Sequence, residues 1–451
     1  MKPLGRIKNL LPAAVASILG QIAPAAVLLT AGLFLSCASV SFSAPASCRV
    51  PEDFFGISPD RSPLNKEDFA LLDDFGAVWI RTTAWWGSVE SEEGVWDFTR
   101  WDAYVEKAKA AGKKIIFILG FDNGWLYKDR KEHRDLTERE IPYFLKYVDQ
   151  MVTRYRGRVD AFEIWNEPNL FFWDGSDEHF YALSGAAAKR IKELDPEVTV
   201  LAGSTFRAAR GFLRGMFKAG AFEYTDGISF HPYASDALRT LKQVDKLRKI
   251  MAEFNYHKPV WITEVGYATG GIYFSFNKLD RYPEYVVKTL SGLAARGVRN
   301  AVWYELMDEY NRDEAPDRWN PSHFFGLVYP DKTFKAGAEA FMLTAGYLRG
   351  AEYRPDLPVR ENADENITGL FFKRPEGTNV LLLWNNGAGA KPLGLAVSGG
   401  PELFRRDISG GEPVPRPAET TLTIGRDPVF IIWEGEGTPR IRGYTFYSKR
   451  Y

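Results

Sequence analysis

Cysteine is nearly missing from this chain. Two cysteines occur among the 451 residues, and both, Cys37 and Cys48, precede residue 50. The body of the chain therefore cannot hold a disulfide framework. Its stability must come from a hydrophobic core, which a chain of this length can bury with ease.

Histidine and net charge are also scarce. The five histidines are widely separated and none forms an H-E-x-x-H pair, and no glycine-rich phosphate or dinucleotide motif occurs. We therefore predict neither a metal nor a cofactor. The 57 Lys and Arg residues balance 58 Asp and Glu residues, so the basic face that a nucleic acid requires is not expected.

The N-terminal segment, residues 1–48, has the character of an export signal. Three basic residues among the first eight precede an uncharged stretch from Asn9 to Cys48, a pattern that directs the rest of a chain across a membrane. The stretch exceeds the about 20 residues that span a bilayer. We expect either a signal peptide cleaved at Ala44-Pro45-Ala46 or a retained membrane anchor, with lipidation at Cys37 as a weaker alternative. The folded body would then be exported, either periplasmic or anchored and facing the periplasm or exterior.

Between residues 54 and 348, short apolar runs alternate with stretches of helical period, which indicates βα units. The predicted strands are Phe54–Ser58, Ala77–Thr82, Lys114–Gly120, Val159–Asn166, Glu197–Gly203, Asp226–Phe230, Pro259–Glu264 and Asn300–Glu305. The predicted helices are Trp101–Ala111, Ile141–Tyr155, Phe180–Leu194, Ala237–Phe254, Pro283–Arg296 and Thr333–Leu348. Eight units of this size predict an α/β fold, a (β/α)8 TIM barrel over residues 50–349.

The pattern changes after residue 350. Helical periodicity stops, and short strand-like runs are separated by Gly, Pro and Asn. These runs are Ile367–Lys373, Val380–Asn385, Leu393–Ser398, Thr420–Ile424 and Val429–Trp433. They predict a small antiparallel β-sandwich over residues 350–435, followed by a tail, residues 436–451, that carries no usable signal.

Two glutamates stand at the ends of predicted strands. Glu167 follows the fourth strand and Glu264 ends the seventh. The carboxyl ends of barrel strands meet at the catalytic face, and glycosidic bond cleavage uses two carboxylates there. We predict that Glu167 is the proton donor and acid/base, and that Glu264 is the nucleophile. The alternative is that both are ordinary surface residues at loop starts.

Neighbouring residues fit the two roles. The Asn166 amide could bind a sugar 2-hydroxyl, and the Arg81 guanidinium could reach across the mouth and keep Glu264 ionised. Apolar neighbours such as Trp165 would let Glu167 keep its proton.

Strands six and eight add three more candidates. His231 could orient a carboxylate or a sugar hydroxyl, and the Tyr233 hydroxyl could donate to the nucleophile. Trp303 could form the floor of the subsite for the reacting sugar. For His231 and Trp303 a plain core position is the alternative.

Aromatic residues make up 14% of the chain, and several are expected on loops at the barrel mouth. Aromatic rings stack on sugars, and there are more of them at the mouth than one sugar ring requires. This surplus predicts an extended groove and internal cleavage of a polymer, with Trp125 and Trp173 binding substrate. The alternative is that the rings pack on one another beneath a lid. The expected set is Trp85, Trp86, Trp125, Trp173, Tyr267, Trp319 and Phe324.

These residues carry a resemblance to clan A glycoside hydrolases, the 4/7 superfamily of retaining barrels. Asn166-Glu167-Pro168 resembles their acid/base motif, and Thr263-Glu264 their nucleophile. Arg81, His231, Tyr233 and Trp303 fall where families 5 and 39 have the same residue types. Residues 86–98 resemble the W-x-x-V-E-P-x-x-G-x-Y-D-F signature, with Ser91 in place of proline.

The chain departs from the family 5 pattern at one place. Family 5 members usually carry a histidine after strand three, where this chain reads Gly120-Phe121-Asp122-Asn123-Gly124-Trp125. Family 39 or a near relative of family 5 is therefore preferred, and a β-sandwich after the barrel also resembles family 39.

The resemblance implies a retaining hydrolase that acts on a polysaccharide or oligosaccharide. Membrane-tethered members associated with bacterial exopolysaccharide operons are similar in layout, which favours an envelope or exopolysaccharide substrate and a possible membrane tether. The alternatives are an exo-acting glycosidase on oligosaccharides and a carbohydrate-binding or assembly protein of the envelope without turnover.

Overall fold

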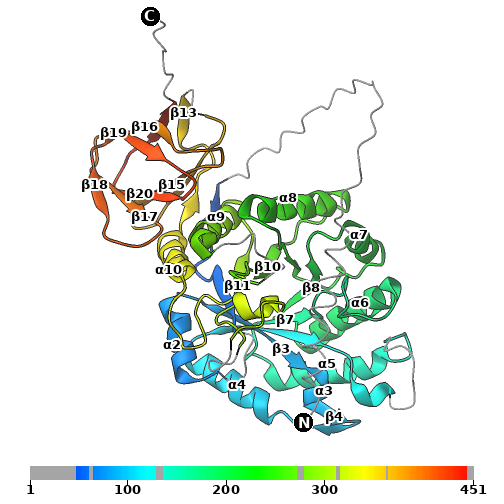
Figure 1. Ribbon diagram of the computed structural model, residues 1–451. Helices are drawn as coiled ribbons and strands as arrows, with labels where there is room; N and C mark the ends of the chain where they lie inside the picture. Colours follow the sequence, from blue (N-terminus) through cyan, green and yellow to red (C-terminus); the bar gives the residue numbers. More distant parts are fainter. Residues whose placement is uncertain are drawn as a thin grey trace, which may run out of the picture.

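The structure is a computed structural model that describes residues 47–59, 64–127, 136–271, 279–310, 315–361 and 364–443. It contains a parallel barrel surrounded by helices and a β-sandwich on one side of it (Figure 1). Nearly all of the predicted export segment, with its cleavage site and Cys37, lies outside the described residues, as does the end of the predicted tail.

Eight parallel strands close the barrel, and each coincides with a predicted strand, so the TIM-barrel prediction is confirmed. The ring closes where β11 pairs with β2. The barrel strands are β2 (Phe55–Ser58), β3 (Trp79–Trp85), β6 (Lys114–Gly120), β7 (Ala161–Ile164), β8 (Thr199–Phe206), β9 (Gly227–His231), β10 (Val260–Val265) and β11 (Asn300–Tyr304).

Amphipathic helices cover the outside of the barrel. On α5, the buried residues Phe144, Tyr147, Val148 and Met151 recur at helical spacing and face the strands. Side chains cap several helix starts, such as Ser176 before α6 and Asp236 before α8. The helices that follow barrel strands are α2 (Lys66–Asp74), α4 (Thr99–Ala110), α5 (Ile141–Tyr155), α6 (Asp177–Leu194), α7 (Arg210–Lys218), α8 (Ala237–Glu253), α9 (Tyr282–Ala295) and α10 (Ala336–Leu348). After β3 come the short helix α3 (Trp86–Val89) and the hairpin of β4 (Glu90–Glu92) with β5 (Val95–Trp96).

The barrel interior is filled in layers. One closed cluster of apolar side chains from six strands forms the layer that we call the apolar layer: Trp79, Ile116, Ala161, Leu201, Trp261 and Val302. Side chains alternate between the two faces of a strand, so the residues two positions further along also point inward. Three of those carry polar groups that meet inside the barrel, where Arg81 and Thr263 both donate to Glu163.

The C-terminal module has two antiparallel-rich sheets, which confirms the sandwich prediction. The sheet nearer the barrel contains β1 (Cys48–Arg49), β12 (Glu352–Tyr353), β14 (Ile367–Lys373), β15 (Thr378–Asn385), β17 (Leu403–Asp407), β18 (Val414–Arg416) and β20 (Val429–Glu434). The other contains β13 (Val359–Glu361), β16 (Lys391–Val397), β19 (Glu419–Ile424) and β21 (Pro439–Gly443).

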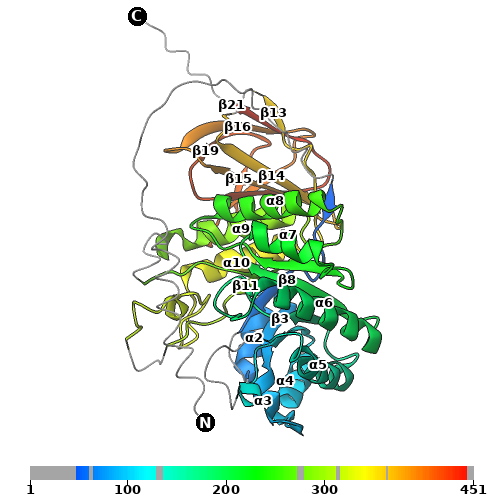
Figure 2. The ribbon, with the colours of Figure 1, turned by 90° about the vertical axis from the view of Figure 1, so that its right-hand side faces the viewer.

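The sandwich packs directly on the barrel. In Figure 2 it lies over the side of the barrel that carries α8, α9 and α10. Strand β15 is buried on both faces: Leu381 and Leu383 enter the sandwich core, whereas Val380 and Leu382 join the core shared with the barrel helices. An ion pair between Arg426 and Glu284 of α9, 2.9 Å long, adds a polar contact at this joint.

Two segments differ from the predicted boundaries. The predicted tail contains β21, which pairs with β16 and β13. The N-terminal residues Cys48 and Arg49 form β1 and pair with β12 at the sandwich edge, so the chain begins its described part in the sandwich before entering the barrel. The Cys48 thiol is half-buried and donates to the Ala294 carbonyl of α9 at 3.5 Å.

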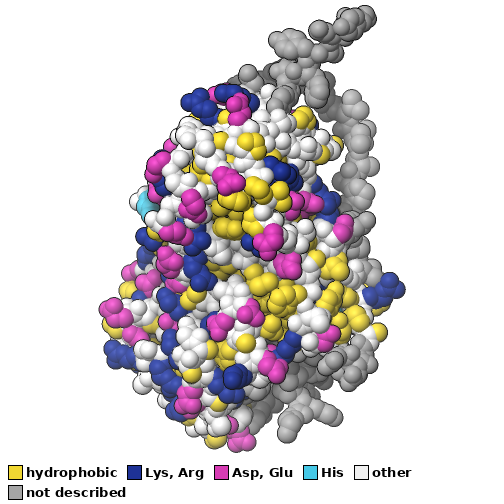
Figure 3. Space-filling model, turned by 90° about the vertical axis from the view of Figure 1, so that its left-hand side faces the viewer, with side chains coloured by type: hydrophobic (Ala, Val, Ile, Leu, Met, Phe, Trp, Pro, Cys, Tyr) yellow, Lys and Arg dark blue, Asp and Glu magenta, His cyan; other side chains and the backbone are white. Residues whose placement is uncertain are grey.

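Figure 3 shows one face of the molecule, with the sandwich above the barrel. Acidic and basic side chains are intermingled on this face, and neither sign forms a continuous patch. The balanced composition of the sequence is thus reflected on this face.

Candidate active site

The backbone changes course where each catalytic candidate leaves its strand. After β7, Trp165 and Glu167 adopt positive φ angles of 67° and 44°, which is costly for residues with a Cβ and is typical of functional sites. Strand β10 carries a bulge relative to β11 between Ile262 and Val265. A bulge re-aims a side chain, and this one contains Glu264.

Arg81 is the centre of the site. Its side chain is 3% exposed and uses three nitrogens: Nε donates to Glu163 Oε2 at 2.7 Å, Nη1 to Glu264 Oε2 at 2.8 Å, and Nη2 to Asn166 Oδ1 at 2.7 Å. The rigid fork of a guanidinium can hold several acceptors in fixed directions. Arg81 therefore fixes the positions of Glu264 and Asn166 relative to each other.

Glu264 has a second donor. The Tyr233 hydroxyl lies 2.6 Å from Glu264 Oε1. Burial and the charge of Glu264 raise the pKa of Tyr233 well above its ordinary value, so the phenol keeps its proton and donates. Each oxygen of Glu264 thus accepts a strong hydrogen bond, an arrangement that stabilises the carboxylate ion.

Glu167 is in contact with His231. His231 Nδ1 lies 2.8 Å from Glu167 Oε1, and its Nε2 lies 3.3 Å from Arg81 Nη2. Arginine can only donate, so Nε2 must accept and the proton must sit on Nδ1. Burial, and after it the charge of Arg81, lowers the pKa of His231 well below its usual range. His231 is therefore neutral and donates to Glu167.

Glu167 is suited to hold a proton. Burial raises its pKa well above the ordinary range, and the negative charge of Glu264 raises it further, against the opposing effect of Arg81. Because His231 donates to Oε1, Oε2 remains as the oxygen that can carry the acidic proton. The two carboxyl groups are thus pushed into different protonation states by their surroundings, as an acid and a nucleophile require.

The two carboxyl groups lie close together. One oxygen of Glu167, one oxygen of Glu264 and a His231 nitrogen all lie within 4.8 Å of one another. Retaining pairs stand about 5–5.5 Å apart and inverting pairs about 6.5–9.5 Å. These three ligand atoms could by spacing alone hold a metal ion, but the Arg81 guanidinium already provides a cation against Glu264 and would repel another.

Sequence reasoning missed Glu163. Its side chain is fully buried, and Oε1 accepts from Thr263 Oγ1 at 2.7 Å while Oε2 accepts from Arg81. The available signal was a charged residue in the middle of a buried strand, Ala161–Ile164, since a carboxylate is almost never fully buried without a partner.

Trp303 is not at the mouth, contrary to the prediction. Its ring has no exposed surface, and its Nε1 donates to the Tyr282 hydroxyl of α9 at 3.1 Å. The reason is strand alternation: Val302 belongs to the apolar layer, so Trp303 points outward to the helices. Tyr304 points inward instead, and its ring packs edge-on against Phe325, which also contacts Tyr233.

Three of the seven predicted groove aromatics, Trp86, Trp125 and Tyr267, are also elsewhere. Trp125 packs against Trp86 and Tyr143 of α5 and lines a cavity of about 240 Å³ beside the β4–β5 hairpin. Trp86 is completely buried, and Tyr267 is 1% exposed with its hydroxyl bonded to core threonines. Trp85 and Trp319 do reach the surface, at 36% and 49% exposure.

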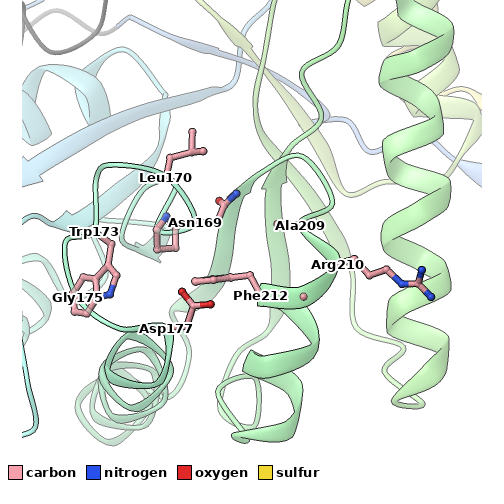
Figure 4. Close-up of a pocket in the computed structure, with 10 residues that line it drawn as sticks. Asn169, Leu170, Trp173, Gly175, Asp177, Ala209, Arg210 and Phe212 are labelled. Carbon is pink, nitrogen blue, oxygen red and sulfur yellow. The ribbon is translucent and has the colours of Figure 1, made fainter. Parts of the chain in front are cut away.

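Trp173 lies near the acid/base loop. It is 7% exposed, packs edge-on against Trp165 and donates from Nε1 to the Ser176 carbonyl. It lines a cavity of about 370 Å³ whose rim includes Pro168, the residue after Glu167 (Figure 4). The whole lining consists of Pro168, Asn169, Leu170, Trp173, Gly175, Asp177, Ala209, Arg210, Gly211 and Phe212.

Two hydrogen bonds connect the loop that lines this cavity to the loop beside the site. The Asn169 amide accepts from the backbone N–H of Phe206 and donates to its carbonyl, at 2.9 and 3.1 Å. The Phe206 ring stacks on Tyr233. The loops after β7 and β8 are thereby held together beside the catalytic pair.

A parallel barrel with a carboxylate after its fourth strand and another on its seventh has the arrangement found in retaining glycoside hydrolases. The family model of Cellulase (glycosyl hydrolase family 5) matches residues 49–304, and the chain belongs to this family. The clan A resemblance seen in the sequence is thereby confirmed.

Solved structures share the fold. A family 39 glycoside hydrolase from Bacteroides cellulosilyticus superposes with a TM-score of 0.69 at 19% identity, covering 85% of this chain and 81% of that one. A monomeric beta-xylosidase from Caulobacter crescentus has a TM-score of 0.61 at 17% identity, covering 86% and 98%. The family model thus points to family 5, and the likeness to the family 39 structure shows that the fold is shared.

Curated relatives match only in part. A beta-xylosidase from Geobacillus stearothermophilus is 30% identical over 141 residues, and one from Caldicellulosiruptor saccharolyticus is 33% identical over 104 residues. The matches span 26% and 20% of those proteins and 30% and 22% of this chain.

Proposed function

We propose that this protein hydrolyses a glycosidic bond with retention, through a glycosyl ester on Glu264. In the first step Glu264 attacks the anomeric carbon while Glu167 donates its proton to the departing oxygen. In the second step water attacks the same carbon, Glu167 accepts a proton from the water, and Glu264 leaves as a carboxylate. The observation that carries the proposal is the close carboxyl pair, in which Arg81 and Tyr233 donate to Glu264 while burial raises the pKa of Glu167.

The environment of Glu167 supports its change of role. The charge of Glu264 is one cause of its raised pKa, and that charge disappears when Glu264 becomes an ester. The pKa of Glu167 should then fall, which turns the acid into the base that the second step needs. Meanwhile, Arg81 occupies the Asn166 oxygen, so the Asn166 NH2 group is available to donate to the sugar 2-hydroxyl.

Azide rescue of two variants tests the mechanism. Glu264→Ala should lose about 10⁵-fold in kcat, and azide should restore turnover by forming a glycosyl azide of inverted configuration. Glu167→Ala with azide should give the retained configuration. NMR spectra of the first product from the wild type should show the retained anomer. An inverted first product would refute retention, and sugar binding without any new reducing ends would favour the non-catalytic alternative.

For the substrate, we propose a polymer that is cleaved internally, a bacterial envelope polysaccharide or exopolysaccharide. The cavity beside the acid/base loop offers space on the leaving-group side, where the departing part of a polymer chain would lie. Exposed Trp85 and Trp319 supply rings for stacking. Incubation with a panel of bacterial exopolysaccharides followed by product sizing tests this, and oligosaccharides in the first minutes are the expected result.

A second candidate is an exo-acting, xylosidase-like enzyme. The names of the two partly matching relatives favour it, as does the burial of Trp86 and Tyr267, which leaves fewer rings for a long groove. Its signature would be rapid cleavage of an aryl β-xyloside and release of monosaccharide alone from xylo-oligosaccharides.

We also propose that the protein is exported. The basic and then uncharged N-terminal sequence supports this proposal. None of the helices in the described ranges combines the length and apolarity needed to cross a bilayer. Fractionation of the native host and N-terminal sequencing of the purified protein should find it outside the cytoplasm, either cleaved near residue 46 or retained with its membrane segment. Recovery of the full-length chain from the cytoplasm would contradict export.

A further inference from the structure

A third carboxylate lies beneath the catalytic pair. Glu163 is on β7, four residues before Glu167, with no exposed surface. Burial of a carboxylate ion is costly unless charged or hydrogen-bonding groups compensate for the lost water. Glu163 has such compensation on both oxygens, from Arg81 Nε and Thr263 Oγ1, each at 2.7 Å.

The contacts of Glu163 determine the direction of Arg81. With Nε bound to Glu163, the plane of the guanidinium is fixed, and its two terminal nitrogens face Glu264 and Asn166. Thr263, which anchors the other oxygen of Glu163, directly precedes Glu264 in β10. The nucleophile is therefore linked to Glu163 by two routes, one through Arg81 and one through its own strand.

Glu163 also balances charge. Without Glu163, the positive charge of Arg81 would be opposed by Glu264 alone and would favour loss of the proton from Glu167. The groups facing Glu167 from the surrounding elements are Glu264 on β10, Arg81 on β3, His231 on β9 and Glu163 on β7. Of these, the negative charge of Glu163 acts with that of Glu264 to keep the acid protonated.

We propose that Glu163 is a positioning residue of the reaction: it aims the Arg81 guanidinium at Glu264 and offsets its charge. The inference rests on the proposed retaining hydrolysis and adds to it a carboxylate that never touches the sugar. Its distinguishing consequence is a change in pH dependence, which a purely structural residue would not produce.

The test compares the pH profile of kcat/KM in the wild type and in Glu163→Gln, which keeps the size of the side chain and removes its charge. The alkaline limb reports the proton on Glu167. It should move about one unit to lower pH, and kcat should fall about ten- to a hundredfold, as when the partner of a site ligand is removed, with KM little changed. Glu253→Gln, which removes a surface partner of Arg214, is the matched control and should leave both unchanged.

Thr263→Val provides a second variant if Glu163→Gln does not fold. It removes one donor to Glu163 but leaves the charge, so kcat should fall several-fold, about as expected for one lost hydrogen bond, while the alkaline limb stays in place. An unchanged alkaline limb in folded Glu163→Gln, or a wild-type kcat in Thr263→Val, would overturn the inference about Glu163. Neither result would contradict the proposed hydrolysis with retention. A wild type that makes no retained product would instead refute the proposed function.

Discussion

Two successive layers inside the barrel differ in almost every property, although the same strands supply both. The apolar layer is closed by six hydrophobic side chains, with Trp79 and Trp261 in edge-to-face contact at 5.3 Å. Two residues further along, the strands supply Arg81, Glu163 and Thr263, linked by hydrogen bonds. The apolar layer gains stability from the burial of apolar surface. The other layer contains buried charges, and apolar residues of similar volume in their place would often be as stable or more so.

The residues that stabilise the barrel and those that carry its chemistry are thus separated by about two positions along a strand. The apolar layer excludes water from below, so the charged layer works in a medium of low dielectric, where each of its contacts is stronger than in water. Changes in the apolar layer should therefore cost stability alone, whereas changes in the charged layer should cost activity as well as stability.

After loss of the nucleophile, the largest effect should come from the acid. Glu167→Gln should reduce kcat about 10²–10⁴-fold on a substrate with a poor leaving group, and far less on an aryl glycoside whose leaving group needs no proton. The melting temperature should not fall, because the variant removes a buried ionisable group. Steady-state kinetics on the two substrate types measure the difference, and equal losses on both would contradict the acid role.

Ile116→Ala should show the opposite behaviour. Ile116 is completely buried in the apolar layer, so truncation should cost about 2–5 kcal/mol of unfolding free energy through lost burial and a cavity. Denaturant unfolding measures this loss. The kcat of the folded fraction should match the wild type, and a large loss in kcat would show that the two layers are coupled.

The pH profile of the wild type tests whether Glu167 holds its proton. Burial and the charge of Glu264 raise the pKa of Glu167, so kcat/KM should stay high past the ordinary range of a glutamate and decline only as pH rises through that raised value. In the glycosyl ester the Glu264 charge is absent and Glu167 acts as a base, so the deglycosylation step should stay fast at high pH and slow only as pH falls through the lowered pKa of Glu167. A profile that declines near pH 4.5 would contradict the raised pKa of Glu167.

The smallest effect is expected at the joint with the sandwich. Arg426 is 46% exposed where it contacts Glu284, and exposed ion pairs contribute about 0–1 kcal/mol. Arg426→Ala should therefore change the melting temperature only slightly and leave kcat unchanged. Leu382→Ala, within the apolar part of the joint, is the comparison that should destabilise clearly.

The sequence was sufficient for the barrel because its signal is local. Apolar runs such as Lys114–Gly120 are buried on both faces and read as strands without knowledge of their neighbours. The sandwich was harder at its edges: β21 alternates proline, arginine and isoleucine over five residues, too short a pattern to distinguish from a tail. Strand β1 has two residues, and its pairing depends on a partner some three hundred positions away.

The residue types of the site could be predicted from the sequence, but the direction in which each side chain points could not. Glu167 and Glu264 could be found as strand-end carboxylates, yet the positive φ angles and the bulge that aim them are tertiary features. Trp303 was misplaced because a shift of one residue moves a strand side chain to the other face. Glu163 was overlooked because its partner, Arg81, comes from a different strand.

The Cys48 thiol gives the molecule a built-in reporter. It sits in β1, where the edge of the sandwich meets α9, and burial raises its pKa, so it should react slowly with thiol reagents while β1 stays paired. The labelling rate of a Cys37→Ser chain would then measure how often this first strand detaches. Substrate or temperature that loosens the joint between the two domains would be seen as faster labelling, with no need for an added probe.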